Sequence, residues 1–64
     1  MVKINGEEKN AMGKTIGEYL TESGYDLKRV AVELNGDILP KTQYECTILQ
    51  DEDSVEIVSF VGGG

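Results

Sequence analysis

Apolar and polar positions alternate with a period of two along several short stretches of the chain, and this alternation predicts β-strands. Residues 2–4, 29–34 and 54–61 show this alternation, and residues 7–10 and 37–39 are expected to be the returning strands of two hairpins. Asn5-Gly6 and Asn35-Gly36 each separate two of these stretches, and an Asn-Gly pair favours the tight turn of a β-hairpin. Residues 7–10 are polar and are therefore expected at an edge of a sheet, with Met12 pointing inward near their end.

One stretch follows the period of an α-helix instead, because three apolar residues are spaced at i, i+3 and i+4. They are Ile16, Tyr19 and Leu20. Thr15 with Glu18 three residues later predicts a capping box at the start of this helix. Gly24 predicts its end. Gly17 inside the helix suggests that the helix approaches a sheet closely.

The elements follow one another as hairpin, helix, strand, short returning strand and last strand. A helix with one apolar face needs a sheet to cover, and we expect the first and last strands to be parallel neighbours. Thr42 with Glu45 is expected to cap a single turn before the last strand. The pattern predicts an α+β protein of the β-grasp (ubiquitin-like) type, a mixed sheet of four to five strands packed on one main helix. Residues 1–61 would form this domain and residues 62–64 a flexible tail.

The composition narrows the classes of partner. A chain of 64 residues makes one small domain with little room for an internal ligand cavity. Its net charge of −6 argues against nucleic acid and anionic membranes as partners. The charge fits docking on a basic protein surface, or solubility alone. Cys46 is the only cysteine and there is no signal-peptide pattern, so a reducing cytoplasm is expected.

The side chains of an enzyme are missing from the sequence. There is no histidine, and Cys46 has neither a second metal ligand nor a base beside it, so we expect no catalytic residue, metal site or bound cofactor. Cys46 is expected to be a small, half-buried apolar residue. Residues 51–53 are acidic but lack the ligand spacing of a calcium loop, which favours a solvated turn.

The last three residues, Gly62, Gly63 and Gly64, are the most informative ones. A tail without side chains passes through a channel that any Cβ atom would block. With Val61 it reaches roughly 13 Å when extended, far enough to place the Gly64 carboxylate in another protein's active site. Attack of this carboxylate on ATP would give an acyl-adenylate, and a sulfur nucleophile could then form a thiocarboxylate. In that scheme the chain is the substrate of a partner enzyme.

The last predicted strand is apolar on both faces near the tail. Only one helix is available to cover the sheet, so Val58 and Phe60 are candidates for a docking surface on the uncovered face, together with Val61 beside the tail. The alternative is a loop that folds over them.

Several segments carry a resemblance that covers nearly the whole chain. They are VAVELNG at residues 30–36 with Ile38 and Pro40 after it, Asp51 and Asp53, VEIV at residues 55–58, FVGGG at residues 60–64, and the opening VKINGE at residues 2–7. Together they resemble the ThiS family, the sulfur-carrier proteins of thiazole biosynthesis. Glu52 departs from this pattern, because the family often has glycine there.

The resemblance implies a ubiquitin-like β-grasp fold and a role for the tail. Gly64 would be adenylated by an ATP-dependent activating enzyme and converted to a thiocarboxylate with sulfur from a sulfur-donating protein. A thiazole synthase would then use this sulfur to make the thiazole half of thiamin. Phe60 and Val61 fall where the family's tail leads into its partners. A sulfur carrier of molybdopterin synthesis, a ubiquitin-like protein modifier and a plain binding module with an inert tail stay open as alternatives.

Overall fold

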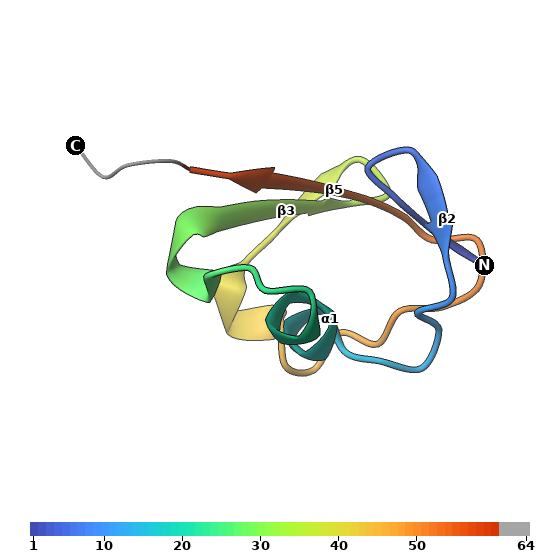
Figure 1. Ribbon diagram of the computed structural model, residues 1–64, viewed down its shortest axis with the longest axis horizontal. Coiled ribbons are helices and arrows are strands. Elements are labelled where there is room, and N and C mark those ends of the chain that lie inside the picture. The colour runs from blue at the N-terminus through green and yellow to red at the C-terminus, as the bar shows by residue number, and fades with distance from the viewer. Residues whose placement is uncertain (61–64) are drawn as a thin grey trace.

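The computed structural model describes residues 1–60, which form a five-stranded sheet with one α-helix on one of its faces (Figure 1). The strands are β1 (Val2–Ile4), β2 (Glu7–Lys9), β3 (Val30–Leu34), β4 (Asp37–Leu39) and β5 (Ser54–Ser59). The helices are α1 (Ile16–Glu22) and two single 3₁₀ turns, η1 (Leu27–Arg29) and η2 (Lys41–Gln43). None of these helices has the length and hydropathy that crossing a membrane requires.

The sheet is mixed, with the strand order β2-β1-β5-β3-β4. β5 is the central strand, parallel to β1 and antiparallel to β3, while the β1–β2 and β3–β4 pairs are antiparallel hairpins. The predicted parallel pairing of the first and last strands is therefore confirmed. So is the β-grasp arrangement of a mixed sheet on one main helix.

Both hairpins turn on an Asn-Gly pair, as the sequence predicts. Asn5 and Gly6 have φ angles of 52° and 84°, and Asn35 and Gly36 have 52° and 90°. Positive φ at both central residues is the requirement of the type I′ turn, whose twist matches that of the flanking strands. The two hairpins therefore owe their register to four residues of local sequence.

Helix α1 begins at the predicted capping box. The Thr15 Oγ1 atom accepts a hydrogen bond from the Glu18 backbone N–H at 3.1 Å, and the Glu18 carboxylate accepts one from the Thr15 N–H at 2.8 Å. These two bonds satisfy donors that the first helical turn leaves without partners. Ile16 and Leu20 are fully buried against the sheet, and Tyr19 packs against the core while remaining half-buried.

The core fills the space between α1 and the sheet. Its buried members are Val2, Ile4, Ala11, Ile16, Leu20, Val30, Val32, Leu39, Tyr44, Leu49, Val55 and Ile57. Met12 is not among them, and its predicted inward orientation is wrong because 49% of its surface is exposed. Ala11 is buried in its place. β2 ends at Lys9, so the strand alternation that would turn residue 12 inward no longer holds there.

Two further expectations differ from the structure near residue 44. Thr42 does not cap a turn, because η2 has Pro40 as its N-cap residue and no side-chain hydrogen bond caps it. Gly17 does lie close to another backbone, but that backbone is Tyr44 and not the sheet. A Cβ atom at position 17 would be 3.5 Å from the Tyr44 carbonyl oxygen.

Candidate functional site

Strand β5 leads to the predicted reactive end of the chain. The strand ends at Ser59, two residues earlier than predicted, and the Phe60 N–H adds one more hydrogen bond, to the Arg29 carbonyl at 2.7 Å. Val61, Gly62, Gly63 and Gly64 lie outside the described residues, so their roles and the domain boundary at residue 61 stay predictions.

Side chains from both hairpin turns hold the first half of β5. The Asn5 Oδ1 atom accepts a hydrogen bond from the Ile57 N–H at 2.7 Å, and the Asn5 N–H donates to the Val55 carbonyl at 2.8 Å. The Asn35 Oδ1 atom accepts from the Ser54 N–H at 2.9 Å. Sequence reasoning assigned only turn formation to these asparagines and missed this second role, which depends on contacts distant in the sequence. The strand that precedes the tail is thus anchored from both sides.

An apolar surface lies on the face of the sheet that carries no helix. Val58 and Phe60 expose 55% and 57% of their surface, and no part of residues 1–60 folds over them. Ala31 lies directly opposite Val58 on β3 and is half-buried. Ile38 on β4, which is 78% exposed, was not predicted as part of this surface. We call Ala31, Ile38, Val58 and Phe60 the apolar face.

The described residues offer no cluster for metal binding. Within residues 1–60, no group of three or more histidine, cysteine, aspartate or glutamate side chains is placed to hold a metal ion. Cys46 is exposed, which corrects the expectation of a half-buried residue. It lies in the turn that follows η2, where its Sγ atom is 3.7 Å from the Gln43 carbonyl.

The acidic turn at residues 51–53 uses its carboxylates locally. The Asp51 carboxylate pairs with the Met1 ammonium, whose hydrogen bond and charge lower the pKa of Asp51. The Asp53 Oδ2 atom accepts a hydrogen bond from the Gln50 N–H at 2.9 Å. Glu52 has a φ of 69°, in the left-handed region where glycine is favoured. These contacts identify the segment as a structured turn.

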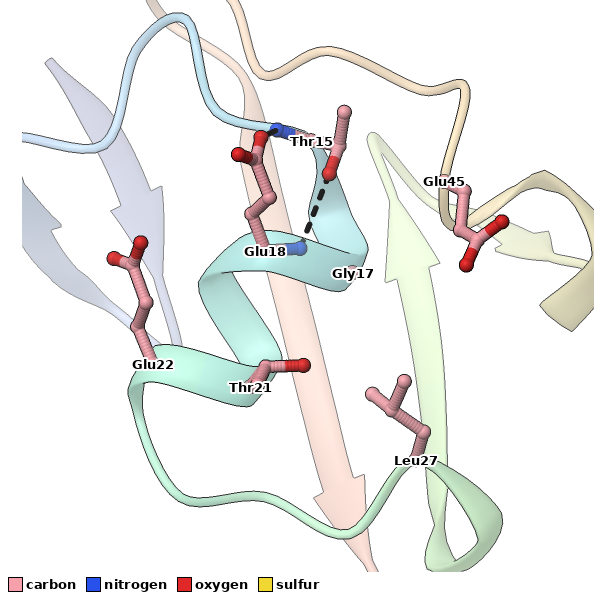
Figure 2. A pocket seen from close by; sticks show the side chains of 7 residues that line it. All are labelled: Thr15, Gly17, Glu18, Thr21, Glu22, Leu27 and Glu45. Atoms are coloured by element: carbon pink, nitrogen blue, oxygen red, sulfur yellow. Dashed lines mark hydrogen bonds between the residues drawn. The ribbon is translucent and has the colours of Figure 1, made fainter.

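An open groove of about 580 Å³ runs beside α1, and Figure 2 shows the side chains that line it. Its lining residues are Thr15, Gly17, Glu18, Thr21, Glu22, Leu27 and Glu45. The Glu18 carboxylate is used in the capping box, and Glu22 pairs with Lys14 on the side of the helix away from Leu27. Two of the three carboxylates that line the groove, those of Glu18 and Glu22, are therefore engaged in contacts within this chain.

Comparisons with known proteins agree with the predicted family. The sequence model of the ThiS family matches residues 2–64. The sulfur carrier protein ThiS of Thermus thermophilus is 42% identical over 64 residues, which is 100% of both chains. The thiazole synthase of Paramagnetospirillum magneticum is 47% identical over 62 residues, which is 95% of this chain and 19% of that protein. The chain thus spans about a fifth of the length of this relative.

A solved structure is similar in fold. The thiamine biosynthesis protein (ThiS) of Geobacter metallireducens superimposes with a TM-score of 0.76 and 31% sequence identity. The superposition covers 98% of this chain and 97% of the other.

Proposed function

The chain belongs to the ThiS family of sulfur carriers, and on that premise we propose that it carries sulfur on Gly64 to a thiazole synthase in thiamin biosynthesis. The observation that carries this proposal is the full-length match to a sulfur carrier protein ThiS, which runs through the terminal glycines. The chain would be a protein substrate, and the catalysis would belong to its partner enzymes.

The proposed chemistry takes place in two steps at the Gly64 carboxylate. A carboxylate oxygen attacks the α-phosphate of ATP held by an adenylating enzyme, which gives an acyl-adenylate and releases pyrophosphate. A sulfur nucleophile supplied by a sulfur-donating protein then attacks the carbonyl carbon and displaces AMP. When the nucleophile is a persulfide, this attack gives an acyl disulfide. A thiol of the partner then attacks the donor's sulfur atom and forms a disulfide with it, and the electron pair of the broken S–S bond leaves on the Gly64 thiocarboxylate. ATP and reduced sulfur are both found in the cytoplasm, where we place this reaction.

The described residues would orient the tail and bind the partner enzyme. Strand β5, which leads to the tail, is anchored near its start by Asn5 and Asn35. Val58 and Phe60 on the apolar face, with Val61 after them, would contact the partner while Gly62 and Gly63 cross its active-site channel. The glycines supply the narrow cross-section and the apolar face supplies the binding energy.

The thiazole synthase is proposed as the sulfur acceptor. In the Paramagnetospirillum protein, a segment similar to this chain occurs within a longer protein named thiazole synthase. This supports a working relationship between the two kinds of protein.

The test is a reaction of the chain with its adenylating enzyme, ATP and a sulfur donor, followed by intact-mass spectrometry. We expect a mass gain equal to the exchange of one terminal oxygen for sulfur. A variant that lacks Gly63 and Gly64 should show no gain while melting at the same temperature. Addition of the thiazole synthase and its substrates should return the original mass. No gain with the complete chain would refute the proposal, and sulfur retention in the presence of the synthase would refute the thiazole assignment.

A further inference from the structure

Two carboxylates lie in the middle of the uncovered sheet face, among the residues of the apolar face. The strand register places Glu33 on β3 directly opposite Glu56 on β5, and it places Ile38 on β4 opposite Glu33. These three residues form one row across three strands. Val58 follows two positions after Glu56 and Phe60 two positions later, so their side chains share this face.

The Glu33–Glu56 pair is unfavourable in the free protein. Residues directly opposite on neighbouring antiparallel strands have Cβ atoms about 4.5–5.5 Å apart, and like charges in such a pair destabilise the sheet. Among the ion pairs of residues 1–60, none includes either carboxylate. Lys3 on β1 lies opposite Ser54, and it forms no ion pair with Glu56 in this part of the chain. Within residues 1–60, neither carboxylate therefore has a cationic partner within 4.0 Å.

We propose that this face docks on the adenylating enzyme by receiving an arginine or lysine side chain of that enzyme between Glu33 and Glu56. Apolar residues around the cation would cover Ile38, Val58 and Phe60. The proposal rests on the sulfur-carrier function and specifies the chemistry of its first partner. A cation between the two carboxylates attracts both of them and offsets the repulsion between them. The two glutamates therefore lower the stability of the free chain and raise the stability of the complex.

The charge of the molecule selects this occupant over a second copy of the chain. A second copy would bring another net charge of −6 and, at a symmetric interface, a second pair of glutamates against the first. An enzyme that binds the triphosphate of ATP must provide positive charge around its active site. The docking face adjoins the end of β5, so it would meet the surface that surrounds that site.

The experiment measures affinity and thermal stability on the same variants. The purified adenylating enzyme of the same organism is titrated with the wild-type chain, with Glu33→Gln/Glu56→Gln and with the control Glu45→Gln/Glu52→Gln. The control removes the same two charges from exposed residues away from this face. We expect Kd for the first double variant to rise at least about tenfold at low salt and the difference to shrink at high salt. We expect its melting temperature to rise by about 1 to 5 °C.

Loss of affinity together with a gain in stability is a combination that a purely structural role cannot produce. Wild-type affinity in Glu33→Gln/Glu56→Gln, or equal loss in the control, overturns the proposal. A fall in both affinity and melting temperature overturns it as well, because the pair would then be part of the fold. Dimerisation of the wild-type chain that strengthens in this variant would assign the face to a second copy. Sulfur gain by the wild-type chain, measured separately by mass, shows whether the carrier function stands when the docking proposal fails.

Discussion

Phe60→Ala separates docking from folding, because the structure leaves most of this ring in solvent. Phe60 is 57% exposed and its backbone N–H, which bonds to the Arg29 carbonyl, is unaffected by the substitution. Complete burial of a phenylalanine side chain contributes about 1.5–3 kcal/mol, so the part that is buried here contributes roughly 1 kcal/mol. For a domain of this size, that corresponds to a fall in melting temperature of about 4–8 °C at most.

The expected effect on docking is larger. An aromatic side chain at the centre of an interface costs about 2 kcal/mol or more when it is truncated, which is roughly a thirtyfold rise in Kd. The assay combines thermal melting with calorimetric titration of the adenylating enzyme. Ile48→Ala is the matched control, because Ile48 is also exposed, at 53%, but lies outside the sheet and its apolar face. Unchanged affinity with a lower melting temperature for Phe60→Ala would refute the docking role and make Phe60 a structural residue.

Four other substitutions test the fold. Gly17→Ala should raise the free energy of unfolding in urea by about 0.5–1 kcal/mol, because the added Cβ meets the Tyr44 carbonyl oxygen at an ordinary 3.5 Å. Gly24→Ala should lower it by about 1–2 kcal/mol because φ there is +87°, and the same sign for both variants would contradict this reasoning. Glu18→Gln should lower the melting temperature at neutral pH but not in acid. Hydrogen bonds with Thr15 hold the pKa of Glu18 below its ordinary value, so its stabilisation is fully present above the unfolded pKa and is lost as the pH falls through the folded pKa. A difference that persists in acid would argue against this role. Glu52→Gly should stabilise the chain by about 0.5–1 kcal/mol in the same urea assay, because φ at this residue is 69°, and a loss would show that the glutamate side chain matters.

The elements whose residues could be predicted individually from the sequence are those that a few adjacent residues determine. The Asn5-Gly6 and Asn35-Gly36 turns and the capping box of α1 each depend on a few adjacent residues. The error at Met12 arose where regular structure stops, because alternation carries information only while the strand continues.

The candidate site was predicted only in part for a related reason. The strand alternation of β5 is long enough to place Val58 outward. β4 has three residues before Pro40, too few to show that Ile38 faces the same way. The meeting of Glu33 with Glu56 depends on the register between strands that are more than twenty residues apart, which no local pattern specifies. Cys46 was misplaced because the turn after η2 has no period from which exposure could be inferred.

The parallel pairing of β1 with β5 has a consequence for how such a carrier can be joined to other proteins. It places Met1 and Ser59 at opposite ends of the sheet (Figure 1). A polypeptide fused before Met1 would extend away from the end where β5 leads to the tail. A polypeptide fused after Gly64 would turn the required carboxylate into an amide and abolish the proposed chemistry. The fold therefore separates a connection made before Met1 from the strand end at which the proposed chemistry would take place.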